Sequence, residues 1–263
     1  MRKLLLLLSI LFCINAQSQI VLDNAAPYNS TAHLLNNVLL GGGIVVSNPS
    51  FIGDPDQIGF FNGINSNVGI DSGIVLSTGD ISDIVGPNAS GSTSSAFNLA
   101  GDATLDAIIF PDLTNDAAVL EFDFVPTSGA ISFRYVFGSE EYLEYVNQFN
   151  DAFGFFLSGP NPSGGTYIDK NLAVIPGTAN TPVTIDNVND ATNSTYYIDN
   201  GTGEDNGWFW PSYDPQYTDP TVIQFDGFTT PLTAVASVIC GESYHIKLVV
   251  ADAVDWSYDS GIF

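Results

Sequence analysis

The chain of 263 residues carries 29 acidic side chains against five Lys and Arg, and its formal net charge at pH 7 is −24. This charge repels nucleic-acid phosphates and anionic lipid headgroups, and it therefore excludes partners of both kinds. A hydrophobic content of 45% supplies a substantial core and excludes a disordered chain, while 25 Gly, 14 Pro and only 13% charged residues favour many short strands and tight turns.

Residues 1–19 are expected to form a signal peptide that is removed on export. Two basic residues precede the apolar run 4–14, and residues 16–18 supply the small side chains of a cleavage site. The run is short for a membrane span, and the alternative is a buried N-terminal helix. Cleavage leaves three basic side chains against 29 acidic ones, a net charge of −26, on one domain of residues 20–263 that contains no transmembrane stretch.

The first part of the mature chain predicts one short helix and then strands. Asn29 or Ser30 can cap a helix that continues to Leu40, with apolar side chains along one face. The elements expected after it are strands at 44–47, 58–61 and 73–77, a loop at 81–101 and a helical turn at 103–109.

The centre of the chain predicts two core strands that enclose an acidic, aromatic-rich loop. Apolar and polar residues alternate from Ile131 to Phe137, and a second apolar run covers 152–157. The segment 117–125 also alternates. Because the turn 126–129 joins it directly to Ile131, the pair predicts a hairpin.

The remainder of the chain predicts further short strands and one irregular section. The expected strands are 171–175, 183–185, 222–225, 232–238 and 244–251. Cys240, which remains alone after cleavage, cannot form an internal disulfide, and we expect it to be a buried, inert thiol.

Acidic residues at the ends of two expected strands form a candidate cation site. Its candidate ligands are Glu140, Glu141, Asn150 and Asp151 at the two ends of the acidic loop, and Asp252, Asp255 and Asp259 beyond the strand 244–251. If the strand ends are adjacent, these oxygens converge, and Ca²⁺ takes 6–8 oxygen ligands of this kind. The spacing matches no EF-hand, and the alternative is an ordinary acidic loop that is hydrogen-bonded to backbone amides.

Paired carboxylates can also serve a glycan hydrolase, in which the two groups lie ~5 Å or ~6.5–9.5 Å apart. Neighbours on an extended strand point to opposite faces, which argues against Glu140 and Glu141 meeting one substrate. No metal-binding motif or nucleophile elbow accompanies His33 or His245, so the sequence predicts no catalytic residue.

A second candidate site lies in the irregular section 189–220, which is rich in Gly and Asn. Its aromatic residues are Trp208, Trp210, Tyr213 and Tyr217. Aromatic side chains on such a loop can stack on sugar rings, so we expect ligand contact there. The alternative is a loop that folds its own aromatic side chains onto the sheet.

The most specific motifs of the chain are FGSEEY at 137–142 and FNDAFGFFLSG at 149–159. Further segments in the same order are GIVLSTGD at 73–80, NLAVIPGT at 171–178, IQFDGFTTPLTA at 223–234 and the stretch 244–263. Together they resemble the choice-of-anchor L domain family, and the resemblance covers residues 32–263.

The resemblance implies a β-rich, secreted or cell-surface module of Bacteroidota and other bacteria, and it implies no catalytic residue set. In similar proteins the domain is followed by different sorting signals, among them type IX secretion sorting domains and a gliding motility-associated C-terminal domain. Because the chain stops on the apolar pair Ile262 and Phe263, we expect it to be a fragment of a longer protein.

These observations predict an all-β protein, a jelly-roll-type antiparallel β-sandwich with long loops and a short N-terminal helix. The expected function is non-enzymatic adhesion, or contact with a glycan or matrix component, at the outer face of the cell surface, with Ca²⁺ as a candidate stabilising ion. The alternative is a secreted glycan-active hydrolase that uses Glu140 and Glu141.

Overall fold

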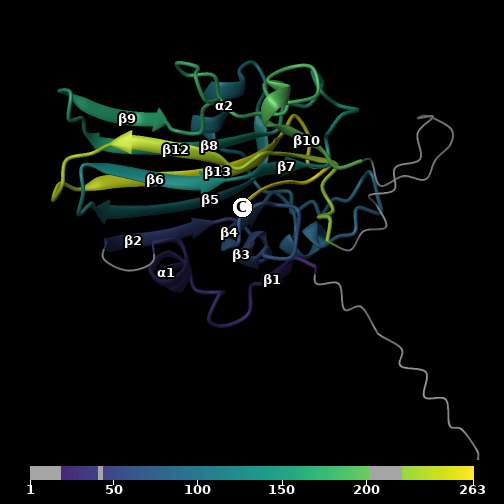
Figure 1. Cartoon of the computed structure of the whole chain (residues 1–263), viewed down its shortest axis with the longest axis horizontal. Coiled ribbons are helices and arrows are strands. Elements are labelled where there is room, and N and C mark those ends of the chain that lie inside the picture. Colours follow the sequence, from purple (N-terminus) through teal and green to yellow (C-terminus); the bar gives the residue numbers. More distant parts are fainter. Residues whose placement is uncertain (1–18, 41–43, 202–220) are drawn as a thin grey trace, which may run out of the picture.

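The computed structural model describes residues 19–40, 44–201 and 221–263, which form two packed layers of antiparallel strands (Figure 1). One layer is a five-stranded sheet in the order β2-β5-β13-β8-β9. Its strands are β2 (Val45–Ile52), β5 (Thr114–Val125), β13 (Tyr244–Ala253), β8 (Ala152–Pro160) and β9 (Thr166–Asn171).

The other layer is a seven-stranded sheet in the order β1-β3-β4-β14-β7-β11-β10, extended by the pair β12 and β6. Only Val136 separates β6 from β7, so the two short strands form one path across this layer. The strands are β1 (Val21–Asp23), β3 (Ile58–Asn62), β4 (Ser72–Ser77), β14 (Ser260–Ile262), β7 (Phe137–Ser139), β11 (Gly227–Thr229), β10 (Tyr197–Asp199), β12 (Leu232–Ser237) and β6 (Ala130–Tyr135).

The described helices are short and lie outside the two layers (Figure 1). They are α1 (Thr31–His33), the π-helix η1 (Leu34–Leu39), α2 (Ala103–Ile109) and the 3₁₀ turns η2 (Pro55–Gln57), η3 (Ile81–Ile84) and η4 (Ser194–Tyr196). The predicted N-terminal helix is confirmed, because α1 runs directly into η1 and the Ser30 hydroxyl oxygen accepts a hydrogen bond from the His33 amide at 3.4 Å. No helix within the described residues is long and apolar enough to span a membrane.

The core between the layers is built from side chains that alternate along the strands. Phe133 and Tyr135 of β6 face β8, where their ring centroids lie 5.0 Å from Phe155 and 5.2 Å from Phe153, respectively. The opposite face of the five-stranded sheet is covered by α2. Its central strands are therefore buried on both faces, which explains their nearly continuous apolar sequences. The predicted antiparallel β-sandwich is confirmed.

The predicted hairpin between 117–125 and Ile131 is wrong. β5 already pairs with β2 on one edge and with β13 on the other, and β6 pairs with β12. The turn 126–129 therefore carries the chain from one layer to the other. Both strands alternate because each presents one face to the shared core, and alternation alone does not distinguish pairing edge to edge from packing face to face.

Several smaller predictions also differ from the structure. Residues 183–185 and 222–225 form no strand, although Thr184 makes an isolated bridge to Ala152. The strand predicted at 171–175 ends at Asn171. Cys240 is exposed, not buried, because it lies in the turn after β12.

The contact between the layers yields a stability prediction. Phe155 is 1% exposed and packs against Phe133, so Phe155→Ala should lower the free energy of unfolding by about 3–5 kcal/mol through lost burial and a residual cavity. Phe110 is 83% exposed, and Phe110→Ala should change the free energy of unfolding by less than about 0.5 kcal/mol. Urea unfolding measures both, and equal losses would contradict the assigned core.

Candidate functional site

The ends of β8 and β13 meet, as the cation-site hypothesis requires. Ala152 at the start of β8 pairs with Ala251 near the end of β13. The fully buried Asp151 joins these ends, because its Oδ1 accepts a hydrogen bond from the Ala253 amide at 2.7 Å. Its Oδ2 accepts one from the Ser260 hydroxyl at 2.7 Å, which ties β14 to the same point.

Asp259 lies at the start of β14 and faces the loop that follows β4. Its two carboxylate oxygens accept hydrogen bonds from the Ser95 amide at 3.1 and 3.0 Å. Gly79 permits this position, because a Cβ at residue 79 would lie 1.9 Å from Asp259 Oδ2. A side chain at residue 79 would therefore displace the carboxylate.

Glu140 and Glu141 follow β7 and are each 1% exposed. Different neighbours repel the two carboxylates. Glu140 is repelled by Asp226 and Asp259, whereas the strongest repulsion on Glu141 comes from Asp151. This division agrees with the predicted alternation of neighbouring side chains. The two carboxylates consequently belong to two adjoining parts of one acidic cluster.

Some oxygens of this cluster receive no hydrogen bond within the described part of the chain. They are both carboxylate oxygens of Glu140, both of Asp252 and Oε2 of Glu141. Asp252, like the two glutamates, is 1% exposed, so bulk water does not replace the missing donors. A buried carboxylate without donors is strongly disfavoured in its charged form unless a proton or a cation neutralises it.

The buried environment raises the pKa of each of these groups. Burial, and then repulsion from Asp255 and Asp259, raises the pKa of Asp151 to about 7, although its two hydrogen bonds favour the charged form. Burial likewise raises the pKa of Asp259 to about 7. For Glu141, burial and repulsion from Asp151 raise the pKa to about 10.

The pKa is raised most for Glu140 and Asp252, the two groups in which both carboxylate oxygens lack a hydrogen-bond donor within the described residues. Burial and repulsion from Asp226 raise the pKa of Glu140 well above its usual range. Gln224 lowers that pKa only partly, because its side-chain amide donates to Asn88 Oδ1 and to the Ser90 carbonyl. The pKa of Asp252 rises through burial and then through repulsion from Asp151 and Asp259. The nearby Thr78 hydroxyl lowers it only partly, because this hydroxyl donates to the Ser260 carbonyl at 3.4 Å.

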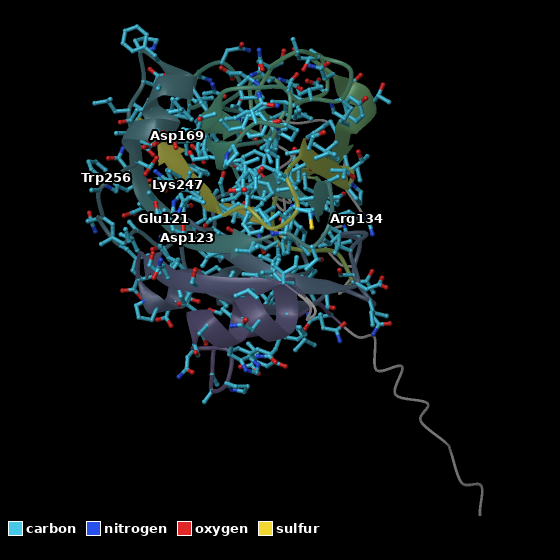
Figure 2. The ribbon with its side chains drawn as sticks, turned by 90° about the vertical axis from the view of Figure 1, so that its left-hand side faces the viewer. Glu121, Asp123, Arg134, Asp169, Lys247 and Trp256 are labelled. Atoms are coloured by element: carbon cyan, nitrogen blue, oxygen red, sulfur yellow. The ribbon has the colours of Figure 1, made fainter. Side chains whose placement is uncertain are left out.

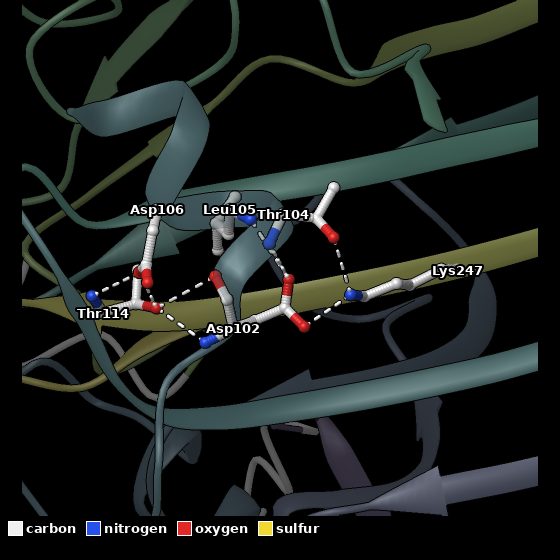
Figure 3. Close-up of polar contacts among 6 residues, drawn as sticks. All are labelled: Asp102, Thr104, Leu105, Asp106, Thr114 and Lys247. Carbon is white, nitrogen blue, oxygen red and sulfur yellow. Dashed lines mark hydrogen bonds and ion pairs between the residues drawn. The ribbon is translucent and has the colours of Figure 1, made fainter. Parts of the chain in front are cut away.

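The cationic side chains of the mature chain lie elsewhere. Lys247 pairs with Asp102, the residue that caps α2 (Figure 3). Arg134 donates to the Gly69 carbonyl at 3.1 Å, on the side of the molecule opposite Lys247 (Figure 2). Lys170 lies over the Tyr167 ring, 4.9 Å from its centroid. No further Lys or Arg follows the expected signal peptide, so the cluster has no basic side chain to neutralise it.

The chemistry of the cluster suits a hard divalent cation, because carboxylate oxygens are the ligands that Ca²⁺ prefers. Among the described residues, no three carboxyl groups already stand in the arrangement of a closed metal site. Cation binding would therefore require the carboxylates to move closer together.

Two residues of the predicted ligand set lie at the margin of the cluster. Asn150 is half-buried, and its Oδ1 accepts a hydrogen bond from the Asp186 amide at 3.0 Å. Asp255 is also half-buried and accepts one from the Ser257 amide at 3.0 Å. Asp255 is thus engaged in a local turn, whereas Asn150 is tied to a segment 36 residues further along the chain.

Two buried aspartates belong to this region although the sequence analysis did not select them. Asp226 is 1% exposed and repels Glu140. Asp116 is fully buried and accepts hydrogen bonds from the amides of Phe97 and Leu99. A single acidic residue beside apolar strand residues is the sequence signal that could have identified both, since Asp116 precedes the run that begins at Ala117 and Asp226 follows Phe225.

The second predicted site cannot be compared with the structure. Trp208, Trp210, Tyr213 and Tyr217 lie outside the described residues.

The raised pKa values predict how stability depends on pH in the absence of divalent cations. Between their ordinary pKa of 3.8 and about 7, Asp151 and Asp259 hold more protons in the folded than in the unfolded state. Their stabilising contribution is therefore complete below about pH 4 and is lost as the pH rises through 7, by up to about 1.4 kcal/mol per pH unit for each proton. Urea midpoints in EDTA should fall between pH 5 and pH 8.

Asp151→Asn removes one titrating group and should flatten this profile. Glu242→Gln, at an exposed position, is the matched control and should leave the slope unchanged. An unchanged slope in Asp151→Asn would mean that the decline reflects only the general repulsion of the acidic surface.

Comparison with known proteins agrees with the resemblance noted in the sequence. No curated protein and no solved structure matches the chain. The family model described as the Choice-of-anchor L domain matches residues 23–263, which include every strand from β2 to β14 and the whole acidic cluster. Members of this family are cell-surface or secreted modules, and the chain belongs to the Choice-of-anchor L domain family.

Proposed function

We propose that the chain is a non-enzymatic extracellular module whose acidic cluster binds Ca²⁺ and thereby stiffens a domain used for contact with glycans or matrix at the cell surface. The observation that supports this most is the set of carboxylate oxygens on Glu140 and Asp252 that are buried and lack donors. The proposed ligands are Glu140, Glu141, Asp151, Asp252 and Asp259, with Asn150 and Asp255 at the margin.

A cation is favoured over protons as the neutralising partner in a neutral extracellular medium. Asp151 and Asp259, whose pKa values are about 7, would be half ionised there, and the neighbouring groups would remain protonated at a cost in hydration. A divalent cation instead converts repulsion among the carboxylates into attraction to a common centre. It would hold the ends of β7, β8, β13 and β14 together, which is a mechanical role suited to a surface module.

Hydrolysis of a glycan is less well supported than cation binding. Glu140 and Glu141 are each 1% exposed, and different carboxylates act on them. A general acid and its partner must reach opposite sides of one glycosidic bond, which requires both groups to line an open cleft. The buried positions therefore favour a structural role for the pair.

The cation proposal predicts a large effect of Ca²⁺ on stability. At 100 times its Kd, Ca²⁺ should stabilise the folded state by about 2.7 kcal/mol and raise Tm by roughly 5–10 °C relative to EDTA. Asp252→Asn should lose at least half of this shift, while its Tm in EDTA should match or exceed that of the wild type because the buried side chain can no longer ionise. Differential scanning calorimetry measures both quantities.

Glu242→Gln serves as the control, because it removes one exposed carboxylate of the same acidic surface. Its response to Ca²⁺ should equal that of the wild type. Coincident transitions in EDTA and Ca²⁺ for the wild type, or an equal loss of response in both variants, would contradict a specific site.

The contact function predicts binding to immobilised glycans that depends on the aromatic residues selected from the sequence. Trp208→Ala and Trp210→Ala should each weaken binding on a glycan array by roughly two- to tenfold, since stacking on an aromatic face contributes about 0.5–1.5 kcal/mol. Phe110→Ala removes an exposed aromatic ring elsewhere and should bind as the wild type does. Binding that no tryptophan variant changes would count against this surface.

A further inference from the structure

Three acidic residues stand opposite one another where β11, β7 and β14 meet in the seven-stranded sheet. Ser139, the last residue of β7, pairs with the first residue of β11 on one side and with the first residue of β14 on the other. One step further along these antiparallel ladders, Glu140 lies between Asp226 and Asp259. The Glu140 amide supports this register, because it donates to the Asp259 carbonyl at 3.1 Å. These three residues are called the carboxyl row below.

The carboxyl row occupies one face of the sheet and is buried along its whole length. Side chains directly opposite each other on neighbouring strands point to the same face. The exposed fractions of Asp226, Glu140 and Asp259 are 1%, 1% and 3%. At the Asp259 end the next position is Gly79, whose missing side chain leaves room for the Asp259 carboxyl.

The segment 86–95, called the covering loop, lies over the carboxyl row and holds its two ends. The Asn88 side-chain amide donates to Asp226 Oδ1 at 2.9 Å. The Ser95 amide donates to both carboxylate oxygens of Asp259, at 3.1 and 3.0 Å. Between these two contacts, neither carboxylate oxygen of Glu140 receives a hydrogen bond within the described part of the chain. The centre of the row is therefore buried without a donor.

The remaining carboxyls of the cluster gather on the opposite face of the sheet. Ser260 is the neighbour of Asp259, and its hydroxyl donates to Asp151 Oδ2 at 2.7 Å. Asp151 in turn is the carboxylate that most strongly repels both Glu141 and Asp252. Because adjacent residues of a strand point to opposite faces, the backbone of the sheet separates this group from the carboxyl row.

We propose that the acidic cluster holds two Ca²⁺ ions, one on each face of the seven-stranded sheet, a division that rests on the proposed function. The second ion is bound by the carboxyl row beneath the covering loop, which assigns Asp226 as a ligand. The first ion keeps the group on the opposite face, which consists of Glu141, Asp151 and Asp252.

The central position of Glu140 supports an ion on the carboxyl row. Like charges directly opposite one another on neighbouring strands are destabilising, and here a carboxyl flanks Glu140 on both sides. The covering loop adds a neutral oxygen at the same place, since the Thr93 carbonyl accepts a hydrogen bond from the Asp259 amide at 3.4 Å. Ca²⁺ takes ~6–8 oxygen ligands of these two kinds, so the row and its cover match its chemistry.

The number of bound ions tests the division. Equilibrium dialysis in physiological salt, which screens the acidic surface, uses Ca²⁺ at a free concentration just sufficient to saturate the wild type, and should give two ions per wild-type chain. Asp226→Asn keeps the shape of the side chain but removes its charge, and it should lose one ion. Glu141→Gln, on the other face, should also lose one, and the double variant should bind none.

Asp199→Asn is the matched control, because it makes the same replacement at an exposed residue of the neighbouring strand β10. It should keep both ions, and circular dichroism establishes that every variant is folded. Amide hydrogen exchange then locates the second ion. Ca²⁺ should slow exchange of the covering loop at least about tenfold in the wild type and in Glu141→Gln, because the ion holds the loop against the sheet, and it should not do so in Asp226→Asn.

Other ion counts would overturn the division. One ion per wild-type chain would contradict two sites and leave the proposed function standing, whereas no bound ion would contradict both. A double variant that still binds one ion would show that Asp226 and Glu141 serve a single centre. Two ions retained by Asp226→Asn, or a covering loop whose exchange Ca²⁺ leaves unchanged, would exclude the carboxyl row as a site.

Discussion

The desolvation of carboxylates at the strand ends is the constraint on which the arrangement of this domain depends. The strand ends that must converge for the two layers to close carry Asp151, Asp252 and Asp259. The burial of these three carboxylates follows from that convergence. Asp151 meets this cost with bonds from Ala253 and Ser260, whereas Asp252 has no donor among the described residues. The layers therefore close around groups that require a neutralising partner.

The same convergence connects the acidic cluster with the centre of the seven-stranded sheet. β14 begins beside Asp259 and pairs with β4 on one side and with β7 on the other. A cation that fixed the start of β14 would therefore also fix the place of this strand between its two neighbours.

The position of the basic side chains explains why neutralisation cannot come from within the mature chain. Lys247 stands on the outer face of β13, where it pairs with the capping residue of α2, and Arg134 lies at the rim of the other layer (Figures 2 and 3). An alternating strand directs such side chains away from the core. The acidic surface and the acidic cluster thus arise from one composition but have different consequences, solubility in one case and a need for neutralisation by a proton or a cation in the other.

The sequence by itself determined the class of fold, most of the strands, the N-terminal helix and the position of acidic residues at two strand ends, because period-two alternation and turn residues act locally. That these two strand ends are adjacent was decided by the pairing of β8 with β13. It did not determine that 117–125 and β6 lie in different layers, since a strand that packs across a core has the same pattern as one that pairs in a hairpin. Nor did it reveal that Glu140, Glu141 and Asp252 are buried, or that Asp116 and Asp226 lie near them. Only the tertiary structure decided these points, because burial depends on residues distant in the chain that exclude water from the same place.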